Sequence, residues 1–260
     1  MITAEEIRKE LTGAFSSVTF QEEGHKYFFD NEYYPETTSV TGLVGSLHAP
    51  FDKEFWSEKK AKKRGVDKSV ILEEWDNNAK FSCDKGTAVH RFMECFYSGL
   101  KFEIPEGLDR PEIVEAVNVI KPNCKKFIID YNNTFIPVVS EFKVGIKEWK
   151  LCGTIDQIFL DKKTGKIWIY DWKTNKEFTM SNRYGSTLLE PFDYLQDCCL
   201  TTYSIQLHLY KKMIEEKTNL KIAGCVLVWL GGNESYKTYQ CLNMANECNI
   251  LVRKRIAELK

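Results

Sequence analysis

The segment KIWIYDWKTNK, residues 166–176, places an acid and a base two positions apart at the end of an apolar run. Side chains alternate between the two faces of a β-strand, so Asp171 and Lys173 share one face while Trp172 points to the other. An exposed ion pair is the ordinary explanation for this spacing. Because the rest of the strand is apolar, however, a charged pair at its end indicates a functional site.

A second carboxylate lies on the preceding predicted strand, GTIDQIF. The turn before Lys166 contains Gly165 and predicts a hairpin, which brings Asp156 close to the level of Asp171. Two converging carboxylates repel each other unless a cation lies between them. Hard oxygen ligands of this kind suit Mg²⁺ or Mn²⁺. The alternative is that Asp156 faces solvent from an edge strand.

Glu141 and Lys143, in VSEFKVG, repeat the alternation of acid and base one strand earlier. Glu141 is therefore a candidate outer ligand or a group that orients water. It could equally be a plain cross-strand partner of Lys143 or Lys173.

Two predicted helices carry further polar pairs at a spacing of four residues, which places each pair on one side of its helix. His90 and Glu94 lie in GTAVHRFMECFY, and Gln206 and Tyr210 lie in YSIQLHLYKK. A lone histidine beside an apolar face is more often a core residue than a ligand. On their own, Gln206 and Tyr210 would be the surface of an amphipathic helix.

The helices and strands that must position these residues are predicted from the periodicity of apolar residues and from the turn residues between them. The first half predicts short strands over residues 15–36 with a turn near Asp30–Asn31, a helix capped by Thr38 or Ser39, a basic helix ending at Gly65, and helices over 68–98 and 110–131. The second half predicts three strands after Pro137, a helix over 193–217, two strands joined by a turn over 231–234, and a final helix.

This order predicts an α/β (α+β) fold, with a mixed central β-sheet flanked by helices and an N-terminal hairpin and helical module. We expect one domain over residues 1–260, in which residues 1–135 carry the histidine motif and residues 136–260 form the sheet. The chain is 43% hydrophobic and 28% charged, which suffices for a real core.

Composition excludes several classes of protein. No segment approaches the roughly 18 apolar residues that cross a membrane. The first residues lack the pattern of a signal peptide or presequence, so an intracellular setting is expected, cytoplasmic or phage- or virus-encoded in a host cell. Nine cysteines without a C-x-x-C pair argue against a zinc ribbon. The net charge of −1 argues against an all-round positive potential and leaves room for a local basic strip.

The motifs together resemble the PD-(D/E)XK nuclease superfamily, over about residues 86–215. The nearest likeness is its RecB-type branch, which includes CRISPR-adaptation nucleases, the mitochondrial genome-maintenance exonuclease and many phage exonucleases. That branch has a helix histidine in a G-T-x-x-H setting, a strand aspartate, an Asp-x-Lys strand and a downstream Q-x-x-x-Y helix. His90, Asp156, Asp171-Trp172-Lys173 and Gln206-x-x-x-Tyr210 occur here in that order. Residues 23–44 also look like the N-terminal module of phage and viral members.

The resemblance implies that His90, Asp156, Asp171 and the backbone carbonyl of Trp172 hold a divalent metal, Mg²⁺ or Mn²⁺. It also implies that Lys173 orients or deprotonates the attacking water, and that Gln206 and Tyr210 contact the substrate strand or brace the catalytic strand. Glu94 is a candidate partner that orients His90. Some relatives carry an iron–sulfur cluster on one cysteine before the core and three after it. Cys83, Cys225, Cys241 and Cys248 stand in those places, but without a tight C-x-x-C pair no cluster is expected.

Candidate contacts with DNA phosphates are the cations of KEFWSEKKAKKRG, where aromatic residues are interleaved, and two hydroxyls. The candidates are Lys59, Lys60, Lys62, Lys63, Arg64, Ser39 and Thr174. The alternative for the lysine-rich stretch is a solvated helix face. The expected function is a metal-dependent DNA exonuclease in recombination, repair or replication, acting on single strands or duplex ends, with partner proteins of those processes. The alternatives are a structure-selective endonuclease of the same fold and a non-catalytic nucleic-acid-binding module.

Overall fold

The computed structural model of the chain describes residues 2–232 and 235–260, so the predicted turn over 231–234 lies partly outside the described residues, at Asn233 and Glu234. The chain divides into two compact units. The sheet unit comprises Met1–His48 and Asn123–Lys260, and the helical unit comprises Ala49–Pro122. The single domain expected from the sequence stays a prediction.

The centre of the sheet unit is a mixed β-sheet, as predicted. Its strands run in the order β4-β6-β7-β8-β9. Strand β5 stands outside this order and also pairs with β6. The strands are β4 (Thr38–Ser39), β5 (Phe135–Ile146), β6 (Leu151–Asp161), β7 (Ile167–Lys173), β8 (Ile222–Trp229) and β9 (Lys237–Gln240). The β5–β6, β6–β7 and β8–β9 pairs are antiparallel, whereas β7–β8 and β4–β6 are parallel.

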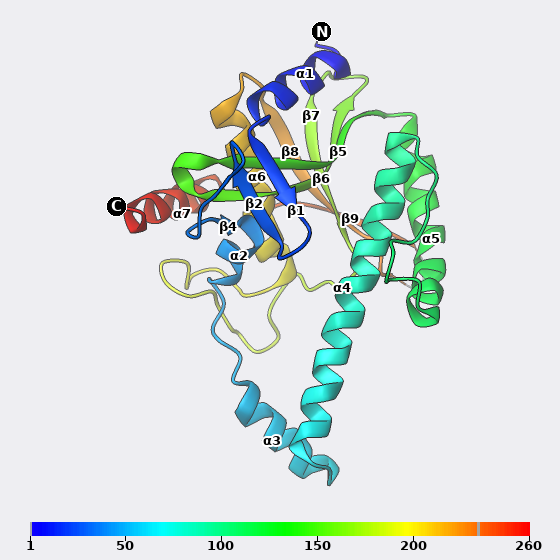
Figure 1. Cartoon of the computed structure of the whole chain (residues 1–260), viewed down its shortest axis with the longest axis vertical. Helices are drawn as coiled ribbons and strands as arrows, with labels where there is room; N and C mark the ends of the chain where they lie inside the picture. Colours follow the sequence, from blue (N-terminus) through cyan, green and yellow to red (C-terminus); the bar gives the residue numbers. More distant parts are fainter. Residues whose placement is uncertain (1, 233–234) are drawn as a thin grey trace. The chain divides into compact units, whose positions relative to one another are not determined.

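Helices and a small second sheet flank this mixed sheet. The helices are α1 (Ala4–Ala14), α2 (Val40–Gly45), α6 (Cys199–Lys217) and α7 (Ala245–Glu258), with a 3₁₀ turn η1 at Lys147–Trp149. The small sheet is β1 (Val18–Gln21), β2 (Lys26–Phe29) and β3 (Glu32–Tyr33), and the predicted turn at Asp30–Asn31 joins β2 to β3. In Figure 1 the blue α1 and β1 lie beside the green β5, and both contact it.

The helical unit contains α3 (Lys53–Arg64) and α4 (Lys68–Ser98), which lie side by side in Figure 1. The predicted end of α3 is confirmed, because Gly65 adopts a left-handed φ of 65° that favours glycine. The buried small residues Ser57 and Ala61 lie four positions apart on α3. Helix α5 (Pro111–Asn132) begins in this unit and ends in the sheet unit. No helix among the described residues combines the length and apolar character that crossing a membrane requires.

Two helices differ from the sequence analysis. Helix α1 was missed, although Thr3 and Glu6 form a capping box in which each side chain bonds the other's backbone N–H. Helix α6 was predicted from residue 193 but begins at Cys199.

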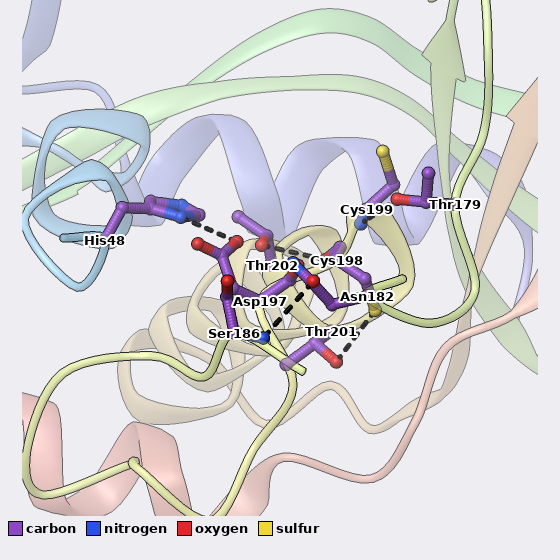
Figure 2. Close-up of polar contacts among 9 residues, drawn as sticks. All are labelled: His48, Thr179, Asn182, Ser186, Asp197, Cys198, Cys199, Thr201 and Thr202. Carbon is purple, nitrogen blue, oxygen red and sulfur yellow. Dashed lines mark hydrogen bonds and ion pairs between the residues drawn. The ribbon is translucent and has the colours of Figure 1, made fainter. Parts of the chain in front are cut away.

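The late start of α6 has a tertiary cause, because loop contacts occupy polar groups of Asp197 and Cys199. The N–H of Asp197 bonds the carbonyl of Ser186, and its carboxylate lies 2.9 Å from Nδ1 of His48. The N–H of Cys199 donates to the Thr179 hydroxyl at 3.0 Å. Figure 2 shows this network around the first turn of α6.

Candidate active site

Three acids form a row across the neighbouring strands β5, β6 and β7 of the sheet unit. They are Glu141, Asp156 and Asp171. Along β6, Gln157 is paired on both sides, with Ser140 of β5 and with Tyr170 of β7. One step further along these antiparallel strands, Glu141 lies opposite Asp156, and Asp156 lies opposite Asp171. Glu141 and Asp156 each present a carboxylate oxygen within 4.8 Å of the other. Side chains directly opposite each other share one face of a sheet, so the row concentrates negative charge.

The backbone is distorted at the β5 end of this row. Glu141 has a φ of 46°, in the left-handed region that non-glycine residues rarely adopt. The ammonium of Lys143 donates to the carbonyl oxygen of Glu141 at 2.7 Å. A conformation of this kind costs on the order of 1–3 kcal/mol and is commonest at functional sites. The distortion therefore sets Glu141 apart from an ordinary cross-strand partner.

The pair at the end of β7 is buried. The ammonium of Lys173 lies 2.6 Å from Asp171, and the two side chains are 13% and 4% exposed. Burial by itself would lower the pKa of Lys173, but the negative charges of Asp171 and Asp156 outweigh it and raise that pKa. The explanation of this spacing as an exposed ion pair is therefore wrong, and Lys173 is held as a cation among carboxylates.

Asp156 does not face solvent from an edge strand, because β6 has neighbours on both sides and Asp156 is 7% exposed. Its carboxylate accepts a hydrogen bond from the backbone N–H of Trp172 at 2.7 Å. The indole of Trp172 packs edge-on against Phe127 at 5.2 Å between ring centroids. The side chain of Trp172 thus belongs to the core, while its backbone takes part in the site.

Helix α6 packs against β5 and β7, two of the strands that carry the acids. Gln206 and Tyr210 are buried, so the explanation as amphipathic surface is wrong. Burial, followed by the negative charge of Asp171, raises the pKa of Tyr210 well above its ordinary value, against the effect of a hydrogen bond with Gln206. The phenol lies where a side chain at Gly153 would be, since a Cβ built there would come 2.8 Å from the hydroxyl oxygen. This close approach joins α6 to β6 near Asp156.

Tyr203 contacts the catalytic candidate Lys173 and Asn175 contacts Tyr203, and the sequence analysis selected neither residue. The ammonium lies 4.1 Å from the ring centroid of Tyr203, which is a cation–π geometry. The side-chain amide of Asn175 donates to the Tyr203 hydroxyl at 2.8 Å. The backbone carbonyl of Asn175 accepts a hydrogen bond from the indole N–H of Trp229 at 2.7 Å. The available signal was the position of Tyr203 one helical turn before Gln206.

The remaining candidates come from other elements of the chain. His90 and Glu94 are on α4 in the helical unit, where the Glu94 carboxylate pairs with Arg91 at 2.6 Å. The hydroxyl of Ser39 caps α2 by accepting the N–H of Gly42 at 2.9 Å. Thr174 follows β7 directly, while Lys59, Lys60, Lys62, Lys63 and Arg64 lie on α3. The roles of these residues stay predictions.

The cysteines considered for an iron–sulfur cluster fall into different parts of the chain. Cys83 is exposed on α4, whereas Cys225, Cys241 and Cys248 are buried in the sheet unit. Burial raises the pKa of Cys241 to about 12, and the thiols of Cys225 and Cys248 donate to backbone carbonyls. Protonated thiols in these contacts behave as small core residues. The expected absence of a cluster stays a prediction.

The donor set of the row suits a divalent metal ion. It consists of carboxylate oxygens on adjacent strands, two of which approach within 4.8 Å of each other. Hard oxygen ligands that leave open positions are typical of Mg²⁺ and Mn²⁺ sites. A cation placed among these carboxylates would also relieve their mutual repulsion.

Comparisons with known proteins include two distant likenesses among solved structures. No protein-family model matches the chain, and no curated protein matches it. Among solved structures, the chain is similar to SSO0001 at 12% identity and a TM-score of 0.34, over 89% of this chain and 80% of that one. It is also similar to a protein from Eubacterium rectale that is provisionally named an exonuclease. That likeness has 10% identity and a TM-score of 0.37, over 67% of each chain.

Proposed function

We propose that the protein is a divalent-metal-dependent DNA exonuclease of the RecB-type PD-(D/E)XK branch. The observation that carries the proposal is the buried pair of Lys173 and Asp171 at the end of β7, level with Asp156 and Glu141. Burying several charges costs stability, and such costly clusters are commonest at functional sites. Hydrolysis of a phosphodiester is a function that would use these charges. The order of motifs along the chain supports the same assignment.

The roles follow from the chemistry of each side chain. Asp156 and Asp171 would hold the metal, with Glu141, His90 and the carbonyl of Trp172 as further ligands or as groups that orient water. When bound, such a metal lowers the pKa of water and offsets the negative charge of the phosphate. The Lys173 ammonium is a compact charge that stays protonated beside Asp171, so it is suited to orient water and to neutralise charge on the phosphate.

Further residues would brace the catalytic strand or contact DNA. Burial of Gln206 and Tyr210 favours bracing of the catalytic strand over contact with DNA. Thr174, which follows Lys173, and Ser39, at the start of α2, would contact phosphates. The cations of α3 would follow the phosphate backbone. The processes served would be recombination, repair or replication.

Digestion of matched linear and circular DNA tests this function. An exonuclease is expected to degrade the linear form in Mg²⁺ or Mn²⁺, to leave closed circles intact, and to stop when EDTA removes the metal. End-labelling of the linear DNA would give the direction of digestion. Nicking of circles would instead establish the endonuclease alternative. A gel shift without cutting, under every metal condition, would establish the binding module and overturn the proposal.

Replacement of Tyr203 tests how Lys173 is positioned. Tyr203→Leu is expected to lower kcat by about 30-fold, because a desolvated cation–π contact contributes roughly 2 kcal/mol. Tyr203→Phe keeps the ring and should retain most of the activity, and KM should change little in both variants. The readout is kcat and KM on linear DNA. Tyr184→Leu, at a tyrosine that is 94% exposed, is the matched control. Equal losses in Tyr203→Leu and Tyr203→Phe would contradict the positioning role.

A further inference from the structure

The N-terminal part of the helical unit exposes three large aromatic side chains close together in the sequence. Phe51 is 63% exposed, Phe55 is 54% exposed and Trp56 is 44% exposed. Phe51 precedes α3, and the other two lie in its first turn. Aromatic rings carry large apolar areas that ordinarily pack in a core or an interface. This concentration of rings on one short segment therefore indicates a contact surface.

The rings form pairs, and lysine ammonium groups lie over them. Phe55 and Trp56 meet edge-on at 5.2 Å between centroids, with the ammonium of Lys59 4.8 Å from the Trp56 centroid. Phe51 meets Trp75 of α4 at 5.6 Å, with the ammonium of Lys60 5.5 Å from the Trp75 centroid. Together, Phe51, Phe55, Trp56, Lys59 and Lys60 are called the α3 surface below.

The charge balance separates the lysines near the rings from the other cations of α3 and α4. Three cations are used in ion pairs within the unit, namely Lys53 with Asp76, Arg64 with Glu74, and Lys68 with Glu54. Over the described part of the chain, no ion pair includes Lys59, Lys60, Lys62 or Lys63. The carboxylates of Asp52 and Asp67 cap helices instead. An excess of positive charge therefore accompanies the exposed rings.

We propose that the α3 surface binds single-stranded nucleic acid, with bases stacked on Phe55 and Trp56 and phosphates on the neighbouring lysines. Unpaired bases offer flat faces to aromatic rings, and their backbone offers phosphates to lysines at the same spacing. A duplex hides the faces of its bases and would leave the rings unused. An apolar protein partner would leave the lysines without counter-charges. The choice of DNA as the ligand rests on the proposed nuclease function.

Binding without cleavage tests the proposal. The full chain carrying Asp171→Asn, in EDTA, is titrated against a fluorescent oligodeoxythymidine of about 20 nucleotides and against a duplex of equal length, by anisotropy. The added pair Phe55→Ala and Trp56→Ala is expected to weaken single-strand binding by at least about tenfold and to spare duplex binding. Lys59→Gln with Lys60→Gln should lower the slope of log Kd against log salt by about 1.4. Tyr184→Ala, at an exposed ring of the sheet unit, is the control.

Several results would overturn the inference. Unchanged single-strand binding in the aromatic variant would do so, as would an equal loss for single strands and duplex. A change from dimer to monomer in sedimentation of that variant, without loss of binding, would make the α3 surface an interface between copies. The nuclease proposal is judged separately, by cutting in Mg²⁺. Loss of single-strand binding in a protein that never cuts would keep this inference and remove that function.

Discussion

Asp171→Asn is expected to lower the rate of DNA cleavage by about 10³-fold, measured as product released from linear DNA in Mg²⁺. The substitution keeps the size of the side chain and one oxygen but removes its charge. The carboxylate lies 2.6 Å from the ammonium of Lys173 and opposite Asp156. The change therefore weakens a metal ligand and also the group that holds the catalytic lysine. Glu177→Gln, at an exposed acid further along the chain, should leave the rate unchanged.

Loss of stability must be separated from loss of chemistry in this variant. Breaking a buried ion pair by removing one partner typically costs about 3–5 kcal/mol, because the other charge stays buried. Asp156 remains close to Lys173 and should reduce that cost. The double variant Asp171→Asn with Lys173→Met removes both charges, so its stability should recover while cleavage stays absent. Cleavage at the parental rate in the single variant would contradict the central assignment.

Trp172→Ala should lower the free energy of unfolding by about 3–5 kcal/mol in a denaturant titration. The indole is 1% exposed, and its contact with Phe127 would be replaced by a cavity. Trp172→Phe preserves an aromatic ring there and should cost less. It should also keep DNA cleavage, because the metal contact proposed for this residue uses its backbone carbonyl.

A matched tryptophan separates burial from residue type in that experiment. Trp56 is 44% exposed, so Trp56→Ala should change the free energy of unfolding by no more than about 0.5 kcal/mol. A folded Trp172→Phe variant that does not cut DNA would give the side chain a part in the chemistry. It would then no longer be a core residue alone.

The sequence by itself determined the features that depend on neighbouring residues. Alternation along β7 placed Asp171 and Lys173 on one face, and the turn at Gly165 set the β6–β7 hairpin that brings Asp156 level with them. Ser39 caps the start of α2 and Gly65 caps the end of α3, both where predicted. Such signals suffice because a cap, a turn or a strand period involves only a few adjacent groups. The capping box of α1 was a signal of the same kind and was overlooked.

Only the tertiary structure decided which groups share an environment. Gln206 and Tyr210 have a spacing that fits a surface helix, yet they are buried, because Gly153 lets the Tyr210 ring approach β6. The cation–π contact of Tyr203 with Lys173 joins residues from a helix and a strand. The left-handed backbone of Glu141 follows no local signal. Contacts between distant segments set burial, strain and pKa, and no local pattern encodes them.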